Sequence, residues 1–380
     1  MKLLYLSNAL VPSRQANSIH VVKICSAFSK INFEVSLICQ NNIEEESKND
    51  EERIFKFYGT EKKFKIYALE KYKSVFSSYI YAFKSFFIAL HKRPRIVVSR
   101  FILSGFLCSI FFNTYIELHQ LPSKNSRIQK YLLNILRFCP RFRGLIVISK
   151  PLKEIFHDIG FSNEMIHVLP DGADTPEKID KSLKIDCRLN DKFKVGYTGH
   201  LYKGRGIDLL ISIAKSCSWL EMNIVGGNEN DINFYKQKVK KMGINNIKIH
   251  GFLEPSKIFK FNSNMDVLVA PYQKKIHLES GETTTEKWMS PLKIFEYMAT
   301  GKPIICSRIE VLNEVLEDSR NCLLCDPEKE EEWINAIKKV KNDNDLREKI
   351  SKEAYSDLVN KFSWIKRAEK IRDLHLKIKK

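Results

Sequence analysis

The chain has 380 residues, of which 44% are apolar, and a formal net charge of +18. This length exceeds what one hydrophobic core usually holds, so we expect two domains. The longest apolar stretch, residues 101–112, falls short of the roughly 20 residues that a membrane-spanning helix needs. Nine cysteines show no framework spacing and no secretory signal opens the chain, so we expect a protein of the reducing cytoplasm.

Strand-like and helix-like segments alternate along the first half of the chain. We expect strands at residues 3–7, 34–39, 95–99, 114–118 and 144–149. Helices are expected at residues 20–30 and 101–112, and another begins near Pro151. The acidic and polar residues 41–52 predict a loop.

A polar stretch at residues 171–192 predicts a linker, after which the alternation restarts. Strands are expected at residues 193–198, 222–225, 247–250, 267–270 and 303–306, and helices at 207–217, 231–241, 290–300, 328–340 and 346–361. The pattern predicts an α/β fold with two Rossmann-like parallel-sheet domains, residues 1–178 and 190–362. A C-terminal helix at residues 363–380 would pack back on the first domain. Such sheets bind ligands beyond the carboxyl ends of their strands, so we expect a site in the cleft between the domains.

Residues 290–303, SPLKIFEYMATGKP, carry the strongest functional signal. Ser290 is a good N-cap and Pro291 suits the first helical position, which puts Lys293 at the third. A cation there opposes the helix dipole unless an anion lies over the helix start, held by free N–H groups and the lysine. Glu296 follows on the same face and could bind a hydroxyl group. The pattern fits a nucleotide-sugar site, and an ordinary surface helix is the alternative.

A second basic loop follows the expected strand 193–198. Gly199 begins it, Gly206 ends it, and Lys203 and Arg205 lie between them. Glycine permits close approach of the backbone to phosphate, and the two cations can bind it. The spacing matches neither of the common phosphate-loop motifs, so an ordinary basic loop is the alternative.

Other candidates are weaker. His119 ends an expected strand and could bind a sugar hydroxyl or the leaving phosphate, or it could be structural. Asp171 and Gly172 form a turn that could approach a ligand. The isolated pair Cys322 and Cys325 predicts buried strand thiols rather than zinc or redox chemistry. Five histidines show no metal-ligand spacing, namely His157, His167, His250, His277 and His375.

Basic and aromatic residues are interleaved between Arg53 and Arg100. This composition favours a patch that lies on an anionic membrane surface. A solvated basic face over an aromatic core is one alternative and nucleic acid is the other. No compact nucleic-acid motif accompanies the patch, so we expect no nucleic-acid partner.

These motifs resemble those of the family 4, or group 1, glycosyltransferases of the GT-B fold, and most closely the bacterial surface-polysaccharide branch. The resemblance extends over most of the chain and includes residues 12–23, 33–35, 148–149, 169–174, 199–206, 290–303, 321–324 and 362–364. It implies a retaining transfer from a UDP- or GDP-sugar to a glycan or lipid-linked acceptor, without a bound metal or other cofactor. From the basic and aromatic patch we also expect a peripheral protein on the inner face of the plasma membrane.

The resemblance assigns roles to individual residues. The donor diphosphate would be held by the loop at Gly199, where His200 replaces the usual Arg and Arg205 matches the usual Lys, with Lys203 as a further cation. Donor contacts would also come from Ser290, Pro291, Leu292 and Lys293.

In the family's E-x7-E motif, Glu296 matches the ribose-binding Glu, but Trp288 stands where the first Glu belongs. Glu282 or Glu286 could substitute for it. His119 matches the acceptor-domain His near the transferred sugar, and Arg205 and Lys293 would stabilise the leaving diphosphate. The alternatives are a nucleotide-sugar 2-epimerase and a catalytically idle sugar- or nucleic-acid-binding protein of the same fold.

Overall fold

The computed structural model describes residues 1–41, 51–71, 76–122, 126–176, 192–276 and 286–377. The chain divides into two compact units. Unit 1 comprises Met1–Asp171 and Trp364–Lys380, and unit 2 comprises Gly172–Ser363. The C-terminal segment therefore belongs to the same unit as the N-terminal sheet.

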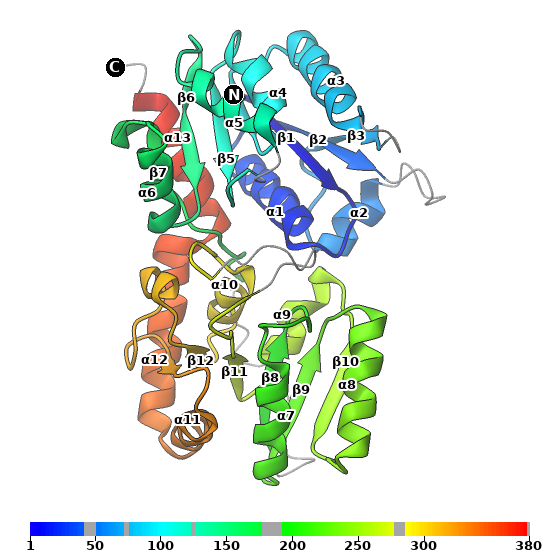
Figure 1. The fold of residues 1–380 in the computed structure, drawn as a ribbon, viewed down its shortest axis with the longest axis vertical. Helices are drawn as coiled ribbons and strands as arrows, with labels where there is room; N and C mark the ends of the chain where they lie inside the picture. Colours follow the sequence, from blue (N-terminus) through cyan, green and yellow to red (C-terminus); the bar gives the residue numbers. More distant parts are fainter. Residues whose placement is uncertain (42–50, 72–75, 123–125, 177–191, 277–285, 378–380) are drawn as a thin grey trace. The chain divides into compact units, whose positions relative to one another are not determined.

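Unit 1 is built on a seven-stranded parallel sheet with the order β3-β2-β1-β4-β5-β6-β7. Its strands are β1 (Lys2–Leu10), β2 (Glu34–Asn41), β3 (Lys65–Glu70), β4 (Ile96–Ser99), β5 (Thr114–Leu118), β6 (Phe142–Val147) and β7 (Ile166–Val168) (Figure 1). Because all strands are parallel, their carboxyl ends meet along one edge, which is where such sheets place their ligands.

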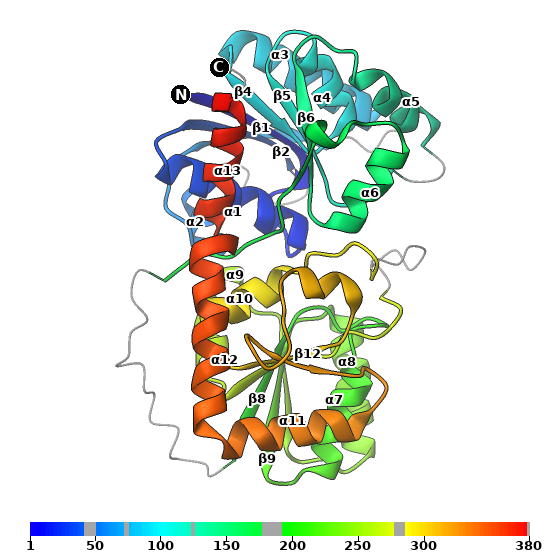
Figure 2. The ribbon, with the colours of Figure 1, turned by 90° about the vertical axis from the view of Figure 1, so that its left-hand side faces the viewer.

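Helices cover both faces of this sheet. They are α1 (Ala16–Lys30), α2 (Glu51–Tyr58), α3 (Ser77–Lys92), α4 (Ile102–Ser109), α5 (Arg127–Leu136), α6 (Lys150–Asp158) and α13 (Trp364–Lys377). Side chains alternate along β1, so Leu4 and Leu6 join the core cluster that includes Tyr81 of α3 and Cys108 of α4. Tyr5 points to the opposite face, where its hydroxyl approaches His20 of α1. Helix α13 packs along α1 on that face (Figure 2).

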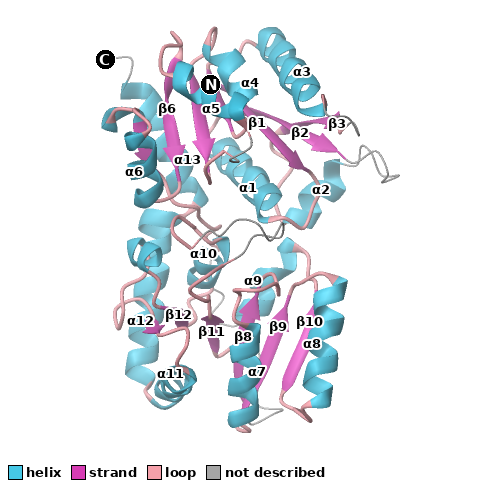
Figure 3. Cartoon of the chain, in the orientation of Figure 1, coloured by secondary structure: helices cyan, strands magenta, loops and turns pink. Residues whose placement is uncertain are grey.

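Unit 2 contains a six-stranded parallel sheet with the order β10-β9-β8-β11-β12-β13. Its strands are β8 (Phe193–Thr198), β9 (Leu220–Val225), β10 (Ile247–Gly251), β11 (Val267–Ala270), β12 (Ile304–Ser307) and β13 (Leu323–Cys325). The helices are α7 (Ile207–Ser216), α8 (Glu229–Lys241), α9 (Pro255–Ser263), α10 (Leu292–Ala299), α11 (Glu330–Asn342) and α12 (Asn344–Asp357) (Figure 3). The prediction of two parallel α/β domains is confirmed.

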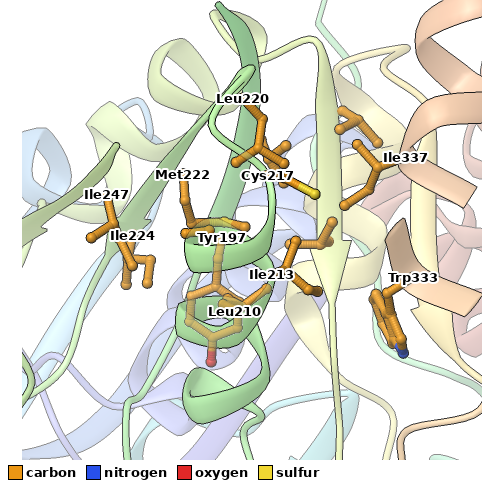
Figure 4. Close-up of a cluster of buried hydrophobic side chains, with 14 of the residues drawn as sticks. Tyr197, Leu210, Ile213, Cys217, Leu220, Met222, Ile224, Ile247, Trp333 and Ile337 are labelled. Carbon is orange, nitrogen blue, oxygen red and sulfur yellow. The ribbon is translucent and has the colours of Figure 1, made fainter. Parts of the chain in front are cut away.

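One core cluster of unit 2 lies between the sheet and helices α7 and α11 (Figure 4). Met222 and Ile224 of β9 meet Leu210 and Ile213 of α7, all of them buried. Trp333 of α11 is completely buried, and its indole N–H donates to the Asp326 carbonyl at 2.9 Å. Replacing such a side chain by alanine costs about 3–5 kcal/mol of unfolding free energy. This core fixes the carboxyl end of β8, where the candidate donor loop begins.

Several expected boundaries were wrong. The helix expected at residues 290–300 is the shorter α10, and Pro291, with φ −78° and ψ 120°, is its N-cap in place of Ser290. Lys293 therefore occupies the second helical position rather than the third. The apolar run 101–112 ends as a helix at Ser109. Residues 51 and 52 of the expected loop begin α2, and residues 42–50 lie outside the described residues.

Candidate active site

The loop after β8 is shaped by glycines. Gly199 has φ +139°, and a Cβ atom there would lie 2.6 Å from the ammonium nitrogen of Lys293. Gly226 follows β9 with φ +116°, and a Cβ atom there would lie 2.0 Å from the Gly199 carbonyl oxygen. Both positions therefore require glycine, because a side chain would collide with backbone or with Lys293. The close approach brings α10 against the end of β8.

Lys293 is a buried basic side chain without a carboxylate partner among the described ion pairs. The residue is only 9% exposed, and its side-chain nitrogen, Nζ, has no hydrogen-bond partner among the described residues. The Nζ lies 3.9 Å from the centroid of the Tyr197 ring and 5.1 Å from that of Tyr272. Burial, followed by repulsion from Arg205, holds the pKa of Lys293 well below its usual range.

Arg205 places a second cation beside the same rings. Its guanidinium carbon lies 4.8 Å from the Tyr202 ring centroid and 5.6 Å from that of Tyr272, and its Nη2 donates to the Tyr202 hydroxyl at 2.7 Å. Aromatic faces stabilise desolvated cations by about 2 kcal/mol or more, but they do not neutralise them. The Lys293–Arg205 pair therefore favours an anion, which would hold the lysine in its charged form.

His200 lies close enough to Arg205 and Lys293 to be affected by their charges. Its ring stacks on Tyr202 with centroids 5.0 Å apart. Burial and the charges of Arg205 and Lys293 lower the pKa of His200 to about 4, so the imidazole is neutral at physiological pH. A neutral ring can still donate one hydrogen bond to a phosphate oxygen. Lys203, in contrast, is exposed.

Helix α10 is held in place by Tyr297. Its hydroxyl accepts from the backbone N–H of Thr198 at 2.9 Å and lies 3.3 Å from the Val269 carbonyl oxygen. The helix start has no side-chain cap at Pro291. Its first N–H groups thus lie at the carboxyl edge of the sheet, where the sequence analysis placed an anion.

The remaining donor-side candidates are spread around this point. Glu296 is half-buried one turn beyond Lys293, and its charge acts to raise the lysine's pKa against the stronger effects of burial and Arg205. The Glu286 carboxylate accepts from the backbone N–H of Ile276 at 3.3 Å, which gives it a structural contact in the loop after β11. Trp288 is half-buried. Glu282 lies outside the described residues.

Unit 1 contains a second polar centre, at the carboxyl end of β5. The Oε1 atom of Glu117 lies 2.7 Å from Nε2 of His20 and 2.7 Å from Nε2 of His119. The guanidinium of Arg367, on α13, is 3.1 Å from the same oxygen, and the Tyr5 hydroxyl donates to Oε2 at 2.8 Å. Nδ1 of His20 lies 2.8 Å from Asp171, just beyond β7. We call these residues the Glu117 cluster.

Charges within the Glu117 cluster can be assigned from its contacts. Burial acts to raise the pKa of Glu117 and of Asp171, but the histidines, Arg367 and their hydrogen bonds outweigh it and hold both pKa values below their usual range. Both carboxylates are therefore ionised, and the ring of His20 lies between them. Burial and the charge of Arg100 lower the pKa of His119 to about 4. Its Nε2–H donates to Glu117, so Nδ1 remains as an acceptor.

His20, His119 and Asp171 lie close enough together to be considered as metal ligands, with one ligand atom from each within 4.8 Å of the others. The donor set does not suit a metal, because both nitrogens of His20 already face carboxylates. The adjacent Arg367 guanidinium also adds positive charge where a cation would sit.

Sequence reasoning missed several members of both sites. Arg367 lies on the apolar stripe of α13 with the buried Trp364, Ala368 and Ile371, and a charge in such a stripe could have signalled a buried partner. The Asp171 turn was noted, but its pairing with His20 was not. Tyr197 and Tyr272 look like ordinary core residues, and no feature of the sequence distinguishes them.

The cysteines are structural in the described part of the chain. Cys322 and Cys325 are buried and free, as predicted, and burial raises the pKa of Cys325 to about 12. Seven of the eight described cysteines are buried, and Cys139 is half-buried. Among the described residues, no helix combines the length and apolar character needed to cross a bilayer.

Residues 179–357 match the family model described as glycosyl transferases group 1. An uncharacterized glycosyltransferase of Methanocaldococcus jannaschii, MJ1069, is 24% identical over 228 residues, which cover 58% of this chain and 55% of the relative. The chain thus matches about half the length of that protein.

Solved structures match over nearly the full length. Anabaena Alr3699/HepE in complex with UDP and glucose has a TM-score of 0.69 at 16% identity, covering 98% of both chains. A glycosyltransferase from Rickettsia africae has a TM-score of 0.72 at 16% identity, covering 100% of this chain and 98% of the other. The chain therefore has the GT-B fold, and its residues 179–357 are similar to the glycosyl transferases group 1.

Proposed function

We propose that the chain is a retaining glycosyltransferase that moves a sugar from a UDP- or GDP-sugar to a glycan acceptor on a lipid carrier, without a divalent metal. The observation that carries the proposal is the Lys293–Arg205 pair. Two cations share the Tyr272 ring, and the lysine nitrogen has no described hydrogen-bond partner. A buried, unpaired ammonium costs several kcal/mol unless an anion binds it.

A diphosphate satisfies this site better than a single carboxylate would. The site offers Lys293, Arg205 and the N–H groups at the start of α10, which are too many donors for one small anion. Glu296, one turn further, adds a carboxylate that could accept from ribose hydroxyls. The likeness to Alr3699/HepE, which binds UDP and glucose, supports a nucleotide-sugar donor.

The proposed chemistry needs no nucleophile from the protein. The bond between the sugar C1 and the diphosphate oxygen breaks, and the acceptor oxygen bonds to C1 from the same face. The departing diphosphate takes the proton from the acceptor hydroxyl. Negative charge grows on the diphosphate during this step, and Lys293 and Arg205 stabilise it in a site that excludes water.

His119 would contact a sugar in this scheme. Its Nε2–H is engaged by Glu117, so its free Nδ1 would accept a hydrogen bond from a sugar hydroxyl. The lowered pKa keeps His119 neutral and therefore able to accept at physiological pH. We further propose a role in surface-polysaccharide synthesis at the inner face of the plasma membrane, supported by the basic surface of unit 1 described below.

The experiment is a thermal-shift panel of UDP, GDP and their sugars on the full chain. A true ligand at 100 times its Kd stabilises the folded state by about 2.7 kcal/mol. We expect this stabilisation with one nucleotide class and its loss in Lys293→Met, while Lys240→Met, an exposed lysine on α8, retains it. Unchanged binding in Lys293→Met would disprove the diphosphate role.

Turnover tests address the finer parts of the proposal. Transfer to an acceptor should continue in the presence of a chelator, and NMR of the product should show the anomeric configuration of the donor. Interconversion of nucleotide sugars without an acceptor would instead identify an epimerase.

A further inference from the structure

Only some of the aromatic residues of the segment 53–100 lie on the surface of the protein. Phe55, Tyr58, Phe64 and Tyr81 are buried, so the segment does not form the continuous surface patch expected from the sequence. Its exposed aromatic residues lie on or next to α3, where Phe83 and Phe87 point away from the core. The exposed surface continues onto helices outside that segment.

Helices α3, α4 and α5 form one side of unit 1. Helix α4 packs against both of its neighbours (Figures 1 and 2). The Phe86 ring of α3 lies 5.7 Å from that of Phe111, just beyond α4, and Arg141, which follows α5, donates from its backbone to Ser109 at 2.9 Å. Six large exposed side chains mark this side, which we call the α3–α5 face: Phe83, Phe87, Ile110, Phe111, Tyr131 and Phe138.

Exposure of this degree is unusual for large apolar side chains. Phe87 is 64% exposed, Tyr131 65% and Phe138 75%. Single exposed apolar residues are ordinary, but a group of them on and directly after packed helices marks an interaction surface.

The charged side chains of the same region are almost all basic. Between residues 71 and 153 the only acidic residue is Glu117, which is buried in the Glu117 cluster. The exposed basic side chains around the face are Lys84, Arg93, Arg127, Lys130 and Arg141. A solvated surface normally mixes both signs of charge, so this face matches an extended anionic partner.

We propose that the α3–α5 face docks on an anionic lipid bilayer. The aromatic side chains enter the headgroup region, and the lysines and arginines contact lipid phosphates. A second copy of the chain fits less well, because it would bring one basic face against another in a protein of net charge +18. Nucleic acid would match the charge but would leave the aliphatic and aromatic surface without a partner.

This proposal rests on the proposed function in one respect only: docking would bring the enzyme to its lipid-linked acceptor. Docking itself requires no substrate. Vesicle binding without nucleotide therefore tests this proposal separately from glycosyl transfer.

The experiment is co-sedimentation of the full chain with vesicles at low salt. The vesicles contain phosphatidylcholine alone or mixed with phosphatidylglycerol. We expect binding to the anionic vesicles only, weakened by salt. Each basic residue at the surface contributes about 1 kcal/mol, so Arg127→Ala/Lys130→Ala should bind about 25-fold more weakly.

Removal of the aromatic side chains provides a second test in the same vesicle experiment. The variant Phe87→Ser/Tyr131→Ser/Phe138→Ser should lose most vesicle binding, whereas Phe234→Ser, an equally exposed phenylalanine on α8 of unit 2, should keep it. Circular dichroism checks that each variant is folded. The proposal is overturned if the unaltered chain ignores anionic vesicles, or if the face variants change only its self-association or its binding to an oligonucleotide.

Discussion

The guanidinium of Arg367 lies 3.1 Å from the carboxylate of Glu117, joining the C-terminal helix to the middle of the N-terminal sheet. Arg367 also donates to the carbonyl oxygens of Leu169 and of Pro170, the latter at 2.7 Å. Helix α13 thus completes the polar centre of unit 1 rather than only covering its surface. The orientation of His119 depends on Glu117, and Glu117 depends in turn on this distant arginine.

Arg367→Met should destabilise unit 1. The substitution leaves Glu117 buried with one balancing charge fewer, and breaking a buried pair in this way costs about 3–5 kcal/mol of unfolding free energy. Chemical denaturation measures the loss, with Lys377→Met on the exposed side of the same helix as control. Equal stability of the two variants would show that the ion pair contributes nothing.

Lys293→Met should stabilise the free protein while abolishing nucleotide binding. Methionine fills similar space without burying an amine that lacks a hydrogen-bond partner, so the gain is about 1–3 kcal/mol. The melting temperature without ligand reports the gain, and calorimetry reports the lost affinity. A fall in stability would mean that the lysine has a structural partner.

Nucleotide binding should take up a proton. The pKa of Lys293 is depressed in the free protein, and a bound diphosphate would raise it, so the lysine becomes protonated on binding. Affinity should therefore fall as the pH rises between the free and bound pKa values. Calorimetry at pH 7 to 9, in buffers of different ionisation enthalpy, measures the uptake directly. The uptake should vanish in Lys293→Met, and uptake retained there would assign the proton to another group.

Gly199→Ala should impair nucleotide binding. The added methyl group would lie 2.6 Å from the Lys293 nitrogen, at a φ of +139° that alanine tolerates poorly, and the strain costs about 1–3 kcal/mol. Gly243→Ala is a matched control, because Gly243 also has a positive φ, of +67°, but its Cβ position meets nothing within 4 Å. Only the first variant should lose affinity, measured with the nucleotide identified in the thermal-shift panel.

Most strands could be predicted from the sequence because each is an apolar run next to a helical period. The edge strands β3 and β7 were not expected, since β3 is largely exposed and β7 has only three residues. The start of α10 could not, since Ser290 and Pro291 have capping propensities that suit either position and tertiary contacts choose between them. The anomaly of a lysine at a helix start pointed to an anion from the sequence alone. Its aromatic neighbours lie on other strands and loops, and only the fold brings them to it.

The Glu117 cluster could not be predicted from the sequence for the same reason: only the fold brings its residues together. Its members come from β1, α1, β5, the turn after β7 and α13, and each is individually compatible with an ordinary core or cap. Hydrogen bonds between residues so distant in the chain leave no local pattern. The excess of basic residues between positions 71 and 153, by contrast, can be seen directly in the sequence, because the sign of a side chain's charge does not depend on the fold.

Cys139 is the one described cysteine that is not buried, and it directly follows Phe138. With Cys187, outside the described residues, changed to serine, a maleimide dye should attach selectively at position 139. Its fluorescence would then report when lipid approaches that end of the molecule, in real time and without any engineered cysteine.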